Sequence, residues 1–341
     1  TEQGVYVFFD ANTLARSRFS FTYSLTSSYT DVGFGCMLRS LQMLLAHTLR
    51  LRMVEADNGK WMELFQEDTL AEATIDTLLQ SSRYIEMVSN FAEGAGGMCC
   101  LSQLVNVGSR KFGASSWSWY SPRIACLIAA EIMNNHNYPG NLMVHVANNR
   151  EVYELELETL FEEGTKSSGN EGDHSVLLLV PCRLGKDSIE EQLQAEIIKH
   201  VRDPCCVGLI GGPSSRGLYC FATTESDTLL CLDPHTTVRV EVGEGSSPES
   251  DEFLKATHTH TNMQEIRLDE LNPELAFGFL FKDKDALSRW FASATEEAEK
   301  ESSKCSKAIT LLHGPALPTL GIPEEDASSE DGEEDDDWKL I

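Results

Sequence analysis

Hydrophobic residues repeat at helical spacing in the first part of the chain. From residue 36 onward, leucines stand three or four positions apart, at Leu38, Leu41, Leu45 and Leu49. This spacing predicts a helix that starts after Gly33 and Gly35 and carries Cys36 in its first turn. A second, mostly helical stretch is predicted from about residue 60 to residue 92.

Apolar runs typical of strands dominate the second half of the chain. They lie at residues 142–147, 175–181, 207–211, 217–224, 228–233 and 277–282. A further strand-like run occupies residues 5–9. Ser188 and Glu191 have the spacing of a capping box, which predicts a helix from residue 188 to about Arg202. The polar stretches 164–173 and 243–252 are predicted to be surface loops.

The composition changes near residue 300, after an amphipathic helix that carries Leu287, Trp290 and Phe291. The remainder of the chain is rich in serine, proline and acidic residues, a composition that cannot bury enough apolar surface to fold alone. We therefore predict a folded domain at residues 1–300 and a flexible acidic tail at residues 301–341.

The net charge of −27 argues against a nucleic-acid-binding protein, because neutralising phosphates needs clustered Lys and Arg. Ten of the negative charges lie between residues 324 and 337. The first ten residues lack the basic and apolar regions of a secretory signal, and no apolar run is long enough to span a membrane. We expect a cytoplasmic protein.

Ten cysteines would suggest a set of disulfides only in an oxidising compartment. Four of them stand in apolar strand-like runs and are expected to be small buried thiols, namely Cys182, Cys206, Cys220 and Cys231. No paired ligands have the spacing of a zinc site, and His258 and His260 stand in a polar loop without a third ligand nearby. We expect no metal and no cofactor.

Cys36 is a candidate nucleophile. A cysteine at a helix N-terminus feels the positive end of the helix dipole, which lowers its pKa, and has unpaired backbone N–H groups close by. Gly33 and Gly35 would let a substrate approach the backbone closely. Taken alone, the pattern fits a buried helical thiol equally well.

Asp233 and His235 are the candidate partners of this cysteine. They stand two residues apart at the end of an apolar strand, so their side chains can lie on the same side of the chain, with Pro234 stiffening the link. A carboxylate beside an imidazole fixes its tautomer and stabilises the imidazolium. The alternative is an ordinary turn at a strand end, which Asp-Pro often begins.

Together, these segments and several others resemble a known family. Residues 31–42 are similar to the nucleophile motif of the autophagins, the papain-like cysteine peptidases that process the ubiquitin-like modifier of autophagy. Further segments resemble that family in the same order, at residues 21–23, 119–122, 182–185, 207–212, 232–237, 277–279 and 283–290. The resemblance covers about residues 5 to 295. It implies an α+β, papain-like fold with a central, mostly antiparallel sheet and a nucleophile helix. The domain at residues 1–300 would then be a papain-like catalytic domain with a small auxiliary subdomain nested in it.

The resemblance also implies roles for individual residues. Cys36 would be the nucleophile, His235 the general base and acid, and Asp233 the residue that orients it. Tyr23 matches a residue whose hydroxyl assists the oxyanion, beside the backbone N–H of Cys36. Trp119 matches the aromatic residue that lines the substrate groove.

A mobile lid is implied at Gly211 and Gly212. The family usually has a lysine between the second glycine and the proline, whereas here Pro213 follows Gly212 at once. Two further departures are Phe34, where tryptophan is usual, and Leu41, where glycine is common.

The implied substrate is a ubiquitin-like modifier that ends in glycine followed by a short extension. The same chemistry would release the modifier from phosphatidylethanolamine, so the enzyme would touch autophagic membranes transiently through the lipidated substrate. We expect it to act as a monomer. Two rival hypotheses are a peptidase for a different ubiquitin-like modifier and a catalytically silent adaptor that holds the modifier.

Trp338 and Ile341, with three aspartates before them, resemble a linear motif that adds a strand to the modifier and fills two apolar pockets. The alternative is a solvated acidic tail in which these residues bind nothing.

Overall fold

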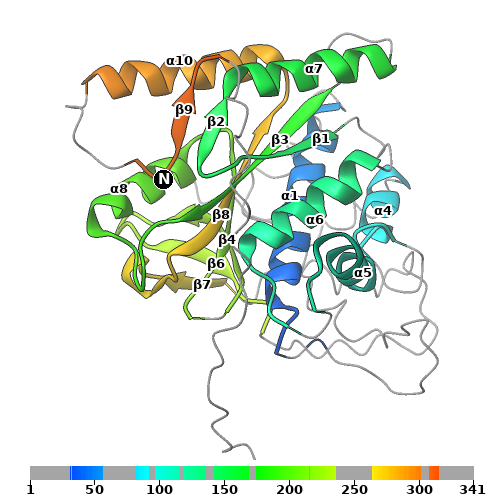
Figure 1. The fold of residues 1–341 in the computed structure, drawn as a ribbon, viewed down its shortest axis with the longest axis horizontal. Coiled ribbons are helices and arrows are strands. Elements are labelled where there is room, and N and C mark those ends of the chain that lie inside the picture. Colours follow the sequence, from blue (N-terminus) through cyan, green and yellow to red (C-terminus); the bar gives the residue numbers. More distant parts are fainter. Residues whose placement is uncertain are drawn as a thin grey trace, which may run out of the picture.

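The computed structural model describes ten segments of the chain, at residues 31, 33–56, 82–91, 97–115, 118–135, 142–168, 174–214, 216–235, 263–300 and 307–314. They form an α+β fold around a central sheet (Figure 1). Within these segments, no helix is both long enough and apolar enough to cross a membrane.

The central sheet has seven strands in the order β1-β3-β8-β4-β5-β6-β7. The strands are β1 (Leu142–Val146), β3 (Ser175–Arg183), β4 (Cys206–Gly211), β5 (Leu218–Thr223), β6 (Leu229–Leu232), β7 (Met263–Ile266) and β8 (Glu274–Phe281). Only the β1–β3 pair is parallel, and the other neighbours run antiparallel. The mostly antiparallel sheet expected from the resemblance is confirmed.

The sheet is buried on both faces because helices cover each of them. Alternate residues of β3 point to opposite sides: Leu177 and Leu179 belong to one apolar cluster, and Val176, Leu178 and Val180 to the other. All five are fully buried. A strand buried on both faces needs a continuous apolar sequence, which explains why residues 175–181 could be predicted as a strand from the sequence.

One face of the sheet is covered by α1 (Cys36–Ala56), α4 (Ser82–Ser89), α5 (Leu101–Phe112) and α6 (Pro122–Asn135) (Figure 1). The helix predicted from Cys36 is α1. Its Met37, Leu38, Leu41 and Leu44 have no exposed surface and pack in the cluster on this face. Since α1 is buried over most of its length, the residue at its first turn is held in a fixed place.

The other face is covered by α7 (Glu154–Ser168), α8 (Glu191–Arg202) and α10 (Lys284–Lys300), with a short 3-10 helix, η2 (Leu268–Glu270). Trp290 of α10 packs against Phe279 and Phe281 of β8, with ring centroids 5.1 Å apart in each case. Its indole Nε1 donates to Asp203 Oδ2 at 3.0 Å. The amphipathic character predicted for this helix therefore serves to attach it to the sheet.

A small second sheet extends the fold beyond the boundary predicted at residue 300. Its strands β2 (Glu151–Tyr153) and β9 (Thr310–Leu312) pair in parallel. Ala308 and Ile309, just before β9, are buried. The prediction that the tail begins at residue 301 is thus wrong for residues 307–314. A few apolar residues of this segment pair with β2, a strand far away in the sequence.

Two local predictions also differ from the structure. The capping box at Ser188 is not formed: α8 starts at Glu191, with Glu190 at the N-cap. Just before the helix, the Glu190 N–H donates to the Leu184 carbonyl at 3.0 Å, so the chain forms a turn there. The loop predicted from residue 164 begins later, since α7 continues to Ser168.

The expectation of free thiols fails at one pair. Cys220 and Cys231 stand directly opposite each other in the register of β5 and β6 and are joined by a disulfide. Cys182 and Cys206 are free thiols, as expected. The two strands that lead toward Asp233 are therefore linked covalently as well as by main-chain hydrogen bonds.

The segment at residues 307–314 should contribute measurably to stability. Ile309 is only 3% exposed, and deleting a buried side chain of this size costs about 2–5 kcal/mol. A chain ending at residue 300 should lose at least about 3 kcal/mol of unfolding free energy relative to one ending at residue 314. Urea denaturation measures the difference, and equal midpoints would show that β9 is dispensable.

Candidate active site

Cys36 is presented by a tight turn at the start of α1. Gly33 adopts φ +96°, a left-handed conformation that favours glycine. The N–H groups of Phe34 and Gly35 both donate to the Asp31 carbonyl, at 3.3 and 2.9 Å. The two glycines noted in the sequence thus have structural roles in the turn that delivers the thiol.

A buried ion pair holds this turn against the helix. Arg39 is 1% exposed, and its Nε donates to Asp31 Oδ2 at 3.0 Å. Its Nη1 also donates to Gln42 Oε1 at 3.1 Å. Arg39 therefore joins the residues before the nucleophile to the second turn of α1.

Asp233 and His235 come from the segment directly after β6. The His235 Nδ1 lies 2.6 Å from Asp233 Oδ1, and the His235 N–H donates to the same oxygen at 2.8 Å. Asp233 is 1% exposed and His235 36%. The carboxylate thus fixes both the backbone and the ring of His235, as expected of two residues separated by one proline.

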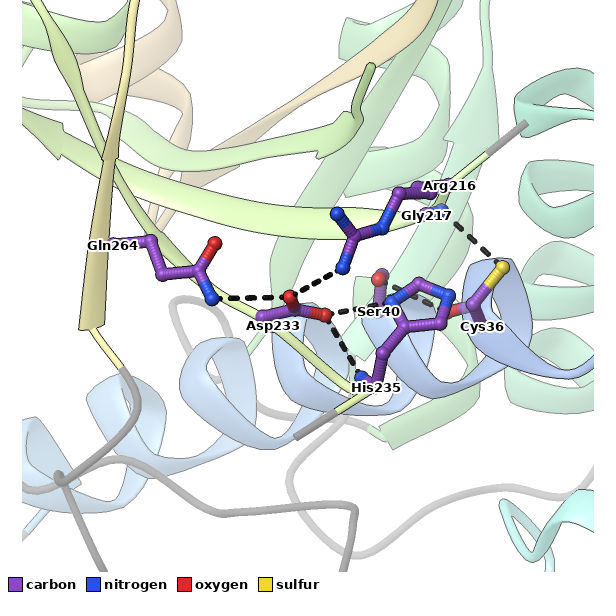
Figure 2. A network of polar contacts seen from close by, with 7 residues as sticks. All are labelled: Cys36, Ser40, Arg216, Gly217, Asp233, His235 and Gln264. Atoms are coloured by element: carbon purple, nitrogen blue, oxygen red, sulfur yellow. Dashed lines mark hydrogen bonds and ion pairs between the residues drawn. The ribbon is translucent and has the colours of Figure 1, made fainter. Parts of the chain in front are cut away.

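The structure brings this pair to the nucleophile helix. Figure 2 shows the imidazole of His235 on the side of Asp233 that faces Cys36. The two side chains are close enough for each to shift the pKa of the other. Residues almost two hundred positions apart in the sequence therefore lie as close together as a nucleophile and its base must.

The thiol of Cys36 is acidified by its surroundings. Burial raises its pKa, but the hydrogen bond with His235, the backbone N–H of Gly217 and the positive charge of His235 outweigh burial. The net result is a pKa below 9.0, the ordinary value for this group. A cysteine with this environment differs from an inert buried thiol.

The pKa values of His235 and Asp233 shift in opposite directions. Hydrogen bonds with Asp233 and Cys36 raise the pKa of His235 to about 9. Burial raises the pKa of Asp233, but hydrogen bonds from His235 and the charges of His235 and Arg216 lower it overall. His235 is therefore mostly protonated near neutral pH, and its positive charge favours the thiolate form of Cys36.

Backbone N–H groups surround the sulfur. The Gly217 N–H donates to Cys36 Sγ at 3.2 Å, and the backbone N–H of Met37 helps to lower the pKa of the thiol. A Cβ at Gly217 would lie 2.6 Å from the Met37 nitrogen, so only glycine fits there. These donors can stabilise negative charge at this end of α1.

Three residues of the site escaped sequence reasoning: Arg216, Gly217 and Gln264. Arg216 Nη2 and Gln264 Nε2 donate to Asp233 Oδ2, at 2.9 and 3.1 Å (Figure 2). Gln264 lies on β7, a strand that the sequence pattern did not predict. Its place beside Asp233 depends on the pairing of β6 with β7, which no local pattern reveals.

The remaining candidate residues divide into those that the structure describes and those that it does not. Trp119 lies shortly before α6, half-buried against the apolar cluster on the α1 face. Gly211 ends β4 and is buried, as is Gly212, and Pro213 is half-buried in the turn after it. Their roles as groove and lid remain predictions. Tyr23, Trp338 and Ile341 lie outside the described residues, as do His258 and His260.

Phe34 and Leu41, the two departures in the nucleophile segment, are both buried in the core. They are thus packing residues rather than members of the site. In the described part of the chain, no group of three or more His, Cys, Asp or Glu side chains could hold a metal ion.

Comparison with known proteins gives a consistent result. Residues 12–293 match the Peptidase C54 catalytic domain. The chain is 26% identical to cysteine protease ATG4a of Arabidopsis thaliana, over 98% of this chain and 70% of that protein. It is 26% identical to cysteine protease ATG4D of Xenopus laevis, over 85% of this chain and 64% of that protein.

A fungal protein, the probable cysteine protease ATG4 of Coccidioides immitis, is 27% identical over 81% of this chain and 57% of its own length. The chain therefore spans between 57% and 70% of the length of these three relatives.

The acidity of Cys36 should depend on His235. In His235→Asn, the thiol loses a hydrogen bond and a neighbouring positive charge, so its pKa should rise. Because alkylation by iodoacetamide requires the thiolate, the rate at pH 6 should fall at least about tenfold.

Peptide mapping by mass spectrometry measures this rate at each cysteine. Cys99 and Cys182 serve as internal references, since burial raises the pKa of each to about 12. An unchanged rate at Cys36 in the variant would contradict the assignment of His235.

Proposed function

This chain belongs to the family of Peptidase C54 catalytic domains, and on that basis we propose that it cleaves after the C-terminal glycine of a ubiquitin-like autophagy modifier. It would do so both to prime the modifier for lipidation and to release it from phosphatidylethanolamine. The observation that carries the proposal is the contact of Cys36, at a helix N-terminus, with a His235 already held by Asp233. The relatives are named as ATG4 cysteine proteases, which supports this class of substrate.

The first chemical step is attack of the Cys36 thiolate on the glycine carbonyl carbon. A bond forms between sulfur and carbon, and the carbonyl oxygen becomes an oxyanion. The His235 imidazolium then donates its proton to the leaving amine as the carbon–nitrogen bond breaks. The product of this half-reaction is a thioester between the modifier and Cys36.

Hydrolysis reverses the role of His235. The neutral imidazole takes a proton from water, whose oxygen attacks the thioester, and Cys36 leaves as the thiolate. Asp233 keeps Nδ1 protonated throughout, because that nitrogen lies 2.6 Å from a carboxylate oxygen. The other ring nitrogen is thus always the one that exchanges protons with the sulfur, amine or water.

The oxyanion requires preorganised donors near the sulfur. Backbone N–H groups at the start of α1 support such a site, together with the dipole of a 21-residue helix. Tyr23 is proposed to add a hydroxyl donor, and the backbone N–H of Cys36 a further one. Each would act mainly in the transition state, where the charge is on oxygen.

Specificity for glycine is proposed to arise from a narrow entrance. Trp119 would form one wall and the Gly211-to-Pro213 segment the other. A residue without a side chain would pass between them, whereas a Cβ would collide. We further propose that the enzyme is cytoplasmic and monomeric and that it meets autophagic membranes only through its lipidated substrate.

Cleavage should disappear without the nucleophile. In Cys36→Ala, the rate at which a modifier precursor loses its extension should fall at least about a thousandfold, because no thioester can form. Asp233→Asn should lose about a hundredfold or more, since the ring is no longer held in the right tautomer. Gel or mass-spectrometric assays follow the product.

Cys99→Ala is the matched control, because Cys99 is a buried thiol with a raised pKa, outside the site. Undiminished cleavage by Cys36→Ala would refute the proposed chemistry. Activity on another ubiquitin-like modifier but not on the autophagy modifier would leave the chemistry intact and overturn the proposed substrate.

The tail motif is proposed as a second contact with the modifier. A chain ending at residue 323 should bind the modifier more weakly, by roughly tenfold, if Trp338 and Ile341 fill apolar pockets on it. Hydrolysis of a small peptide should be unchanged. Calorimetry with full-length and shortened chains measures the difference, and equal affinities would show that the motif binds nothing on the modifier.

A further inference from the structure

The second oxygen of Asp233 has a set of partners that the proposed mechanism does not use. Oδ1 accepts hydrogen bonds from His235, through the ring and the backbone N–H. Oδ2 accepts one bond from Gln264 at 3.1 Å and one from Arg216 at 2.9 Å. The Asp233 side chain is 1% exposed, so these four donors take the place of water around a buried charge.

Arg216 comes from the turn that connects β4 to β5. The Arg216 N–H donates to the Pro213 carbonyl at 3.0 Å. Asn272 ties the same turn to the start of β8, with its N–H on the Gly212 carbonyl at 2.9 Å and its side-chain amide on the Ser214 carbonyl at 3.2 Å. The backbone that carries the guanidinium is therefore held at several points.

The neighbouring residue contacts the opposite end of the triad. Gly217 donates to Cys36 Sγ at 3.2 Å, while Arg216 pairs with Asp233 (Figure 2). Two consecutive residues of one turn thus touch both the nucleophile and the carboxylate. Any shift of this turn would be felt at both ends of the triad.

From this arrangement we propose that Arg216 is a positioning residue, which acts on the reaction through Asp233. The inference rests on the proposed cysteine-peptidase chemistry. The guanidinium fixes the rotation of the carboxylate, so that Oδ1 points at His235 Nδ1. It also supplies a permanent positive charge beside Asp233.

The permanent charge matters because the charge on His235 is temporary. After His235 gives its proton to the leaving amine, the imidazole is neutral, and the buried carboxylate has lost its nearest cation. Gln264 is a neutral donor and cannot replace that charge. Arg216 remains protonated throughout, so Asp233 stays ionised and continues to orient the ring.

Arg216→Gln tests the proposal, with Arg216→Lys as the conservative variant. Without the cation, kcat should fall about tenfold or more, while KM should stay within about twofold because the residue acts through Asp233. The pKa values that limit kcat on the acidic and the alkaline side of its pH profile should both rise by roughly half a pH unit. The arginine charge disfavours the imidazolium and favours the thiolate, so removing it raises both pKa values. Arg216→Lys keeps the positive charge and should restore both pKa values.

Two further variants separate charge from packing. Gln264→Met removes the other donor to the same oxygen without changing the charge. It should therefore lower kcat and leave both pKa values of the kcat profile unchanged. Arg202→Gln is the matched surface control: Arg202 is 48% exposed against 51% for Arg216, and it pairs with Asp227 at 2.7 Å, outside the site. This control should match the wild type in kcat and in profile.

The pH dependence of Cys36 alkylation repeats the measurement without any protein substrate. A shifted alkylation profile in Arg216→Gln supports the inference even if the proposed modifier is not the substrate. A profile identical to that of Arg202→Gln, a failure of lysine to restore it, or a rise in KM with unchanged kcat would overturn the positioning role. Circular dichroism shows whether each variant is folded.

Discussion

The site depends on one interaction, that between the thiol of Cys36 and the imidazole of His235. It joins the first turn of a buried helix to the end of a strand almost two hundred residues later. The imidazolium lowers the pKa of the thiol, and Cys36 adds to the effect of Asp233 in raising the pKa of His235. The surrounding fold can be understood as the means of holding these two groups at a fixed separation.

Rigidity on both sides of that contact comes from burial. The helix that carries the thiol has its Met37 and Leu38 in the core, and the Asp31–Arg39 pair keeps the preceding turn in place. On the other side, β6 is flanked by β5 and β7 and linked to β5 by a disulfide. Packed elements of this kind give better-defined sites than loops do.

Much of this architecture was legible in the sequence, and the reasons are local. Leucine spacing after Cys36 and the apolar run at residues 175–181 report burial on one helix face and on both faces of a strand. The Asp-Pro-His order places two side chains together through geometry alone. By contrast, β9 lies in a segment whose composition indicates a tail, and only its distant partner β2 makes it a strand.

The contacts of Arg216, Gly217 and Gln264 could not be predicted for the same reason. Each depends on which strands become neighbours and in what register, and those are properties of the folded sheet. At Ser188 the chain is still in the turn that the Glu190 N–H closes on the Leu184 carbonyl, so the predicted capping box is not formed. Local chemistry identifies the reacting groups, and the topology determines which residues support them.

Gly217 limits the directions from which a substrate can reach the sulfur of Cys36. Its N–H covers one side of the sulfur, and the imidazole of His235 occupies another. An incoming carbonyl must therefore reach the sulfur from a direction that these two groups leave open. A main-chain N–H thus restricts the approach of the substrate as well as holding the sulfur.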